Sequence, residues 1–191
     1  MLTTDKILDA AEEVLRKYGP RKITVVDVAR SLGVSHGTVY RHFASKVDLH
    51  EAITGRWLQR VLLPLLEIAK KDSEPKARLR EWFEALVKLK HDLVKNEVEM
   101  FESYSALAKS MPKEKKAIHI NAMLKMIEGI LEDGKQRGEF DFEDSAVTAK
   151  CLFFATILYH HPLHAHEWNN EHIYDDFEHL FQLLEKAIHK V

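Results

Sequence analysis

The chain has 191 residues, 46% hydrophobic and 30% charged, with a formal net charge of −2. This is the composition of a globular protein and excludes bulk disorder, while seven glycines and five prolines are too few for a turn-rich all-β fold. There is no run of 18 apolar residues, no signal-peptide layout, and only one cysteine, Cys151, so a membrane span, a secreted chain and a disulfide framework are all excluded. We therefore expect a cytoplasmic, mostly helical protein.

Caps and turn residues divide the first third of the chain into four predicted helices. Their approximate ranges are 7–18, 24–32, 35–42 and 45–71. Thr24, Ser35 and Ser45 carry short side-chain oxygens of the kind that cap helix N-termini, and Thr24 and Ser45 are each followed three residues later by Asp, as in a capping box. Gly33 indicates a tight turn, and Pro64 is expected to kink the fourth helix.

Helical periodicity continues to the end of the chain. Further helices are predicted from Ser73, over 97–108, from Pro112 to 137, from Asp141 or Asp144 to about His160, and over 171–190. No stretch has strand periodicity. The fold class is therefore all-α, with about nine helices. We expect an N-terminal three-helix DNA-binding domain over residues 1–50, with a helix-turn-helix, and a larger helical bundle over 51–191.

Three residues indicate the helix-turn-helix. Ala29, Gly33 and Val39 have the spacing that this motif requires: the small Ala lets the second helix approach, Gly takes the turn, and Val fills the angle between the helices. A plain helical hairpin is the alternative. The surrounding charge favours DNA, because residues 14–47 contain seven basic side chains and one acid, whereas residues 140–191 contain nine acids and three bases.

The run Thr38–Phe43, followed by Ser45, Lys46 and Leu49, resembles the DNA-binding signature of the TetR family of bacterial transcriptional regulators. The resemblance covers roughly residues 4–53. It implies base or nearby phosphate contacts for one set of residues, Ser35, His36, Gly37 and Thr38. It implies backbone contacts for another set, Thr24, Tyr40, Arg41, His42 and Lys46. His42 packed beside Phe43, and Tyr40 stacked on the first helix, are the alternatives for those two residues.

The resemblance also implies a homodimer that reads a palindromic operator, with two recognition helices about 34–36 Å apart. The two last long helices match the family's dimer-forming pair. The candidate interface residues are Phe154, Leu158, Phe177, Phe181 and Leu184. The alternative is that these apolar faces only complete the core of one subunit.

Methionines and aromatic residues gather in the middle of the chain, and such side chains form adaptable walls for apolar ligands. The candidate pocket residues are Trp82, Met100, Phe101, Tyr104, Met123 and Met126. Simple core packing is the alternative for each of them. The resemblance implies a small-molecule effector here, and the wall residues favour a hydrophobic or amphipathic one.

A histidine cluster, His160 to His166, is the one metal-like constellation in the sequence. It supports an alternative function, a small metal-dependent hydrolase with Glu167 or Glu171 as base. Pro162 interrupts the helical spacing of His160 and His164, and no nucleophile triad, phosphate loop or dinucleotide motif is present. We therefore expect neither an enzyme nor a cofactor. A helical interaction protein without DNA binding is the third alternative, which leaves the basic segment unexplained.

Overall fold

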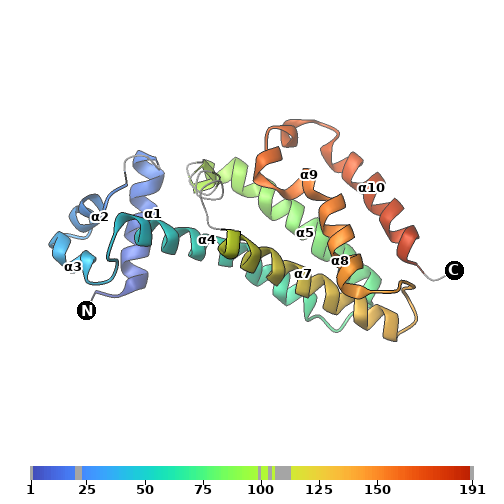
Figure 1. Cartoon of the computed structure of the whole chain (residues 1–191). Helices are drawn as coiled ribbons and strands as arrows, with labels where there is room; N and C mark the ends of the chain where they lie inside the picture. The colour runs from blue at the N-terminus through green and yellow to red at the C-terminus, as the bar shows by residue number, and fades with distance from the viewer. Residues whose placement is uncertain (1, 20–22, 99, 103–104, 106–112, 190–191) are drawn as a thin grey trace. The chain divides into compact units, whose positions relative to one another are not determined.

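A computed structural model describes residues 2–19, 23–98, 100–102, 105 and 113–189. These residues form nine α-helices and two short 3-10 helices, without a β-strand (Figure 1). The α-helices are α1 (Thr4–Tyr18), α2 (Val25–Ser31), α3 (His36–Tyr40), α4 (Lys46–Ala69), α5 (Pro75–Asn96), α7 (Lys113–Gln136), α8 (Ser145–Ala155), α9 (Ile157–His160) and α10 (Ile173–Ile188). The all-α prediction is confirmed. The helix predicted over 97–108 falls mostly outside the described residues.

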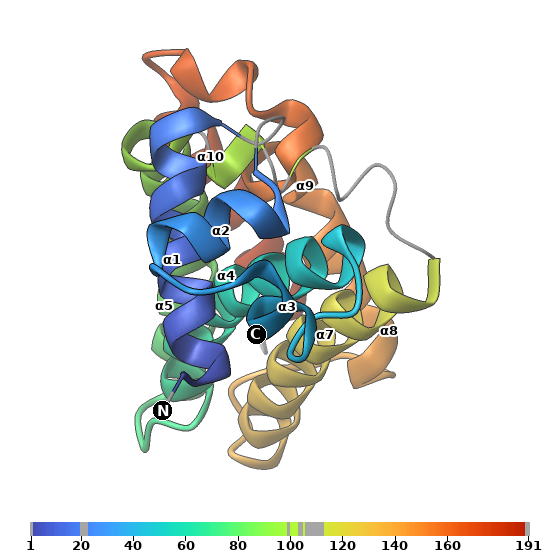
Figure 2. The ribbon, with the colours of Figure 1, turned by 90° about the vertical axis from the view of Figure 1, so that its left-hand side faces the viewer.

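The chain divides into two compact units, residues 1–60 with 93–111 and residues 61–92 with 112–191. In the first unit, α1, α2 and α3 gather around the beginning of α4 (Figure 1, Figure 2). Its core is made of fully buried apolar side chains: Ile7, Ala11, Ile23, Val28, Val39 and Leu49, each 0% exposed. Burial of this apolar area is the main stabilising contribution to so small a helical cluster.

In the second unit, α7 packs against α8, and α5 lies between this pair and α10 (Figure 1). Arg80 of α5 donates hydrogen bonds to Glu178 (2.7 Å) and Glu185 of α10. Beneath these ion pairs the rings of Phe83 and Phe181 lie 5.2 Å apart. Polar pairs at the rim and aromatic packing inside therefore fasten α10 to α5.

Local chemistry explains most helix ends. Asp144 caps α8 by accepting a hydrogen bond from the Val147 amide (2.8 Å), and Ser45 accepts one from the Asp48 amide (3.1 Å) at the start of α4. Gly138 follows α7 with φ +77°, a conformation that glycine adopts without strain. The predicted caps at Ser45 and Asp144 are confirmed.

The structure departs from the sequence prediction at Thr156. One continuous helix was expected from Asp144 to about His160, but α8 ends at Ala155 and α9 begins at Ile157. Thr156 is 0% exposed, and its hydroxyl donates to the carbonyls of Leu152 (3.0 Å) and Phe153 (3.1 Å). A buried hydroxyl bonded to the preceding turn competes with the helical ladder and interrupts it.

Candidate nucleic-acid interface

Residues Thr24 to Tyr40 form a helix-turn-helix. The Thr24 hydroxyl accepts a hydrogen bond from the Asp27 amide (3.2 Å) and donates one to the Asp27 carboxylate (2.5 Å), which secures the start of α2. Gly33 turns the chain with φ +66°. Ala29 (2% exposed) and Val39 (0% exposed) lie at the buried contact between α2 and α3. The three residues therefore occupy the places that the motif requires.

The outer face of α3 presents hydrogen-bonding groups to solvent. His36, Gly37 and Arg41 are exposed. Half-buried Thr38 shares a 2.9 Å hydroxyl–hydroxyl hydrogen bond with Ser35, and the Arg41 guanidinium donates to Thr38 (3.4 Å). Ser35 was expected to cap α3 with its side chain, but its hydroxyl bonds to Thr38 instead of to a helix amide. These short polar groups leave room for base edges to approach the helix.

Basic and aromatic side chains flank this face. Tyr40 is 45% exposed, and His42 is exposed beside buried Phe43, with its Nδ1 atom 3.4 Å from the Thr4 hydroxyl. Among the ion pairs of the described residues, none involves Arg41 or Lys46, whereas Asp27, the one acid of the segment, pairs with Arg30 at 3.4 Å. The cations near α3 are therefore available for phosphates.

A buried carboxylate ties α1 to α4 within the same unit. Glu12 is 3% exposed and contacts three arginines: Arg60 at 2.5 Å, Arg16 at 3.6 Å and Arg56 at 3.7 Å. Arg16 and Arg60 also lie 4.0 Å from Glu97. The sequence analysis missed this network, because Glu12 reads as an ordinary polar residue of an amphipathic helix. Its position one residue after buried Ala11 was the available signal.

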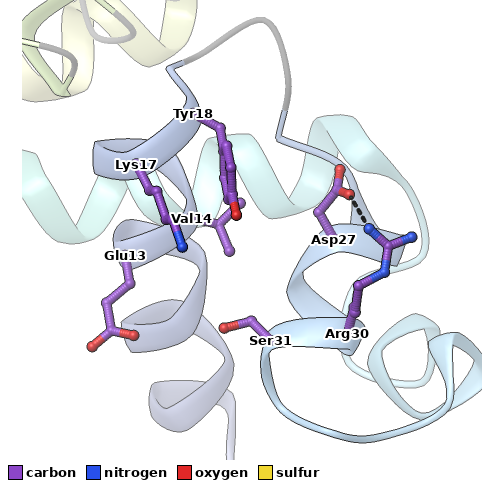
Figure 3. Close-up of a pocket in the computed structure, with 7 residues that line it drawn as sticks. All are labelled: Glu13, Val14, Lys17, Tyr18, Asp27, Arg30 and Ser31. Carbon is purple, nitrogen blue, oxygen red and sulfur yellow. Dashed lines mark hydrogen bonds and ion pairs between the residues drawn. The ribbon is translucent and has the colours of Figure 1, made fainter.

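A surface hollow of about 500 Å³ lies between α1 and α2 (Figure 3). Its charged lining is balanced, with Glu13 and Lys17 from α1 and the Asp27–Arg30 pair from α2, and Tyr18 stands between the two helices. Because it is open and polar, it does not have the character of a pocket for an apolar molecule.

The predicted pocket residues separate in the structure. Trp82 (0% exposed) and Met123 (4%) are buried in the second unit, where Met126 is half-buried. Met100 (2%) and Phe101 (9%) are buried in residues that belong to the first unit. Tyr104 lies outside the described residues. The indole Nε1 of Trp82 is buried without a hydrogen-bond partner, so it retains the capacity to donate to a bound molecule.

Basic side chains, which the sequence analysis did not single out as a site, come together in the interior of the second unit. Lys90 on α5 is 3% exposed and His160 on α9 is also 3% exposed. Burial lowers the pKa of Lys90 to about 8, and burial lowers the pKa of His160 to about 3. Burial, helped by the charge of Lys90, lowers the pKa of His119 on α7 to about 4. At neutral pH this cluster therefore holds one ammonium among uncharged imidazoles.

The histidines from His160 to His166 do not converge. His160 points into the core, with its Nε2 atom 3.2 Å from the Phe153 carbonyl and 3.3 Å from the Thr156 hydroxyl. His161 accepts from the Leu163 amide (3.3 Å), and His166 is exposed beside Glu167. Within the described parts of the chain, no three His, Cys, Asp or Glu side chains are placed to share a metal ion. The residues therefore do not fit the catalytic metal of the hydrolase alternative.

An apolar face lies open on α8, α9 and α10. Phe154 is 48% exposed and Leu158 38%, and the sequence analysis missed two more exposed residues, Val147 (54%) and Leu183 (65%). Val147, Phe154 and Leu158 recur at spacings of seven and four, the signal of one helical face.

Two of the proposed interface residues belong elsewhere. Phe177 is 4% exposed and Phe181 is 1% exposed, and their rings lie 5.6 Å apart inside the subunit. They are core residues and do not reach a partner, because α10 turns this side toward α5. Leu184 is half-buried. In the part of the chain that the structure describes, no helix combines the length and apolar character needed to cross a membrane.

Family models match both parts of the chain. Residues 7–53 match the model described as bacterial regulatory proteins, tetR family, and residues 75–181 match the tetracyclin repressor-like C-terminal domain. The Fatty acid metabolism regulator protein of Bacillus subtilis is 26% identical over 156 residues, which are 80% of this chain and 78% of that protein. The HTH-type transcriptional repressor BepR of Brucella suis is 39% identical over 54 residues, 28% of this chain and 26% of that protein.

Solved structures share the fold. The repressor SmeT of the Stenotrophomonas maltophilia multidrug efflux pump SmeDEF superposes with a TM-score of 0.71 at 18% identity, over 100% of this chain and 92% of that one. A TetR transcription regulator from Haloarcula marismortui gives 0.72 at 19% identity, over 98% of each chain. Together with the helix-turn-helix and the match over residues 75–181, more than half of the chain, these findings establish that the chain belongs to the tetR family of bacterial DNA-binding regulators.

Proposed function

We propose that this regulator is a homodimeric repressor that binds a palindromic operator and leaves it when a small hydrophobic or amphipathic molecule binds the C-terminal domain. Residues 1–50 would form the DNA-binding domain and residues 51–191 the ligand-binding and dimerisation domain. The observation that carries the proposal is the exposed face of α3, with Arg41 and Lys46 unpaired among the described residues and the lone acid Asp27 neutralised by Arg30.

The contacts on α3 divide by chemistry. Ser35, His36, Gly37 and Thr38 stand at its N-terminal end, where side chains reach base edges in the major groove. Tyr40, Arg41, His42 and Lys46 suit phosphates, and we assign Thr24 to a phosphate at the start of α2. Because the Thr24 hydroxyl hydrogen is engaged by Asp27, this residue would contact DNA through its backbone amide or by exchanging that bond.

Dimerisation would use the open apolar face of Phe154, Leu158, Val147 and Leu183, with Leu184 at its edge. A single short recognition helix makes too few base contacts for specific binding, so a second copy related by a two-fold axis is needed. Exposed aromatic and aliphatic side chains on two adjacent helices supply the apolar centre that stable interfaces require.

The relative from Bacillus subtilis, which matches most of this chain, is named for fatty acid metabolism. This supports an effector with an apolar part. The buried Trp82, Met123 and half-buried Met126 of the second unit supply apolar and polarisable surface for such a molecule.

The DNA proposal is tested by incubating the purified protein with sheared genomic DNA of its source at physiological salt and sequencing the retained fragments. We expect one enriched palindrome. With that fragment, Lys46→Ala should weaken binding to all sequences and lower the salt slope by about one unit, whereas His36→Ala should change the preferred sequence. The control is Lys125→Ala, which removes an exposed lysine of α7. Uniform retention of all fragments would contradict the proposal.

The dimer proposal is tested by Phe154→Glu and Leu183→Glu, measured by sedimentation. Each should shift the protein to monomers and weaken operator binding, while Leu63→Glu, an exposed apolar residue of α4 (58%), should leave the dimer intact. Phe181→Glu is unsuitable, because it places a charge in the core. A folded Phe154→Glu protein that remains dimeric would refute the assignment of this face.

A further inference from the structure

Antiparallel packing of α5 against α7 places Lys90 opposite His119. The ion pair between Arg78 of α5 and Asp133 of α7 sets the register near one end of the two helices. Lys90 lies 12 residues along α5 from Arg78, about 18 Å at 1.5 Å per residue. The same distance back along α7 from Asp133 ends between His119 and Met123. The influence of the Lys90 charge on His119 agrees with this placement.

The third wall of the cluster comes from α9. The Nε2 atom of His91 lies 2.9 Å from the Tyr159 carbonyl, so α9 packs directly on α5 beside Lys90. His160, the next residue along α9, is close enough for the Lys90 charge to lower its pKa further, beyond the larger effect of burial. Three helices therefore bring Lys90, His119 and His160 to one buried place.

The charges that act on these histidines are all basic. For His119 the acting charge is Lys90, for His160 it is Lys90 with His161 and His164, and for His161 it is His164 and Lys90 with Lys116. A buried place with such surroundings has a positive potential, which favours an anion. In addition, the Nε2 atom of His119 is buried without a hydrogen-bond partner, and an unmet buried polar atom is costly unless a bound group satisfies it.

Apolar residues continue from this place along the same helices. Trp82 and Leu86 precede Lys90 at four-residue intervals on α5, and each is 0% exposed. Met123 and Ile127 follow His119 at four-residue intervals on α7 and are 4% and 0% exposed. The buried surface therefore changes from basic to apolar along the α5–α7 pair, with the unpartnered Trp82 Nε1 on its apolar part.

We propose that Lys90 and His119, backed by His160, receive the anionic head group of the effector, and that the effector is an amphipathic molecule with a carboxylate-type head and an apolar tail lying along the Trp82 and Met123 faces. The inference rests on the proposed function, because it names the chemistry of the ligand at the same domain. The Lys90 ammonium supplies the charge, and the His119 imidazole supplies a hydrogen-bond donor.

The test compares two probes that differ in the head group alone, dodecanoate and dodecan-1-ol, both below their solubility or micelle limits. Binding is followed by tryptophan fluorescence and calorimetry with the full-length protein at neutral pH. Wild type should bind dodecanoate at least tenfold more tightly than dodecan-1-ol. Lys90→Met should weaken dodecanoate binding at least tenfold and leave dodecan-1-ol binding within about twofold.

Lys88→Met is the matched control, because Lys88 lies on the same helix with its side chain 72% exposed and paired with Asp92. It should behave as wild type. His119→Leu provides a second variant if Lys90→Met does not fold: it should reduce the preference for dodecanoate several-fold, while His119→Gln, which keeps a donor, should retain it. Equal binding of the two probes by wild type, no binding of dodecanoate, or an unchanged preference in folded Lys90→Met would overturn the inference.

Operator binding separates this inference from the proposed function. A protein that retains one palindrome but shows no Lys90-dependent preference would refute the head-group site and leave the repressor standing. A protein with the Lys90-dependent preference that selects no palindrome would refute the repressor and leave the anion site standing. With both present, dodecanoate should release the operator from wild type and not from Lys90→Met.

Discussion

The network around Glu12 leads to a quantitative prediction for Glu12→Gln. The substitution keeps the shape of the side chain and removes its charge, so three arginines face a neutral amide. Gln also brings an NH₂ group toward guanidinium donors, and one of the two acceptor oxygens is lost. The DNA-binding unit should lose stability because Glu12 joins α1 to Arg56 and Arg60 of α4.

The magnitude follows from the geometry. The 2.5 Å contact between Glu12 and Arg60 is a hydrogen bond between charged groups, with a net contribution of about 1.5–3 kcal/mol. The longer contacts to Arg16 and Arg56 involve side chains 46% and 29% exposed, so each adds at most about 0.5 kcal/mol after solvent screening. The arginines can turn to water when the carboxylate is gone. We therefore expect a loss of about 2–3 kcal/mol.

Thermal unfolding followed by circular dichroism measures this loss. For a chain of this size, about 2–4 °C per kcal/mol predicts a fall in Tm of roughly 4–12 °C. Glu13→Gln is the control, because it makes the same chemical change at the neighbouring, exposed residue. It should change the unfolding free energy by less than about 0.5 kcal/mol. Equal shifts for the two variants would show that Glu12 contributes no more than a surface charge, and the reasoning would be refuted.

Two further predictions concern the second unit. Gly134→Ala puts a Cβ atom 2.2 Å from Cδ2 of Phe140, so despite the better helix propensity of Ala we expect a net loss of about 1–2 kcal/mol in chemical denaturation, whereas Gly129→Ala on the same helix meets nothing within 4 Å and should stabilise by up to about 1 kcal/mol. Matching effects of the two would contradict this packing. His160 titrates at about 3 when folded and near 6.5 when unfolded, because burial disfavours its charged form; the unfolded state therefore binds the extra proton, and stability should fall as the pH drops below 6.5, by about 2 kcal/mol at pH 5. The pH slope of unfolding should become shallower in His160→Gln but not in His166→Gln, which alters an exposed histidine; the same slope in all three proteins would argue against a neutral, buried His160.

The helices and the DNA-reading motif could be predicted from the sequence because their determinants are local. Thr24 caps α2 through an amide three residues away, and Gly33 turns the chain through its own φ angle. Val39 is buried because it is the one apolar side chain on the inner side of a five-residue helix. Interactions over three or four residues depend little on the rest of the fold, so pattern and spacing are sufficient.

The interior of the second unit was decided by the tertiary structure. Lys88 and Lys90 look alike in the sequence, yet Lys88 is exposed and Lys90 is buried, because Lys90 shares the face of Trp82 and Leu86 that packs on α7. Phe154 and Phe181 both read as apolar helix residues, and only the packing of α10 on α5 separates the exposed one from the core one. Helical periodicity defines a face, but which neighbour covers that face depends on residues a hundred positions away. The sequence thus determined the class of protein and its DNA-binding helix, while the register between helices decided the buried basic cluster and the apolar surface left open for a partner.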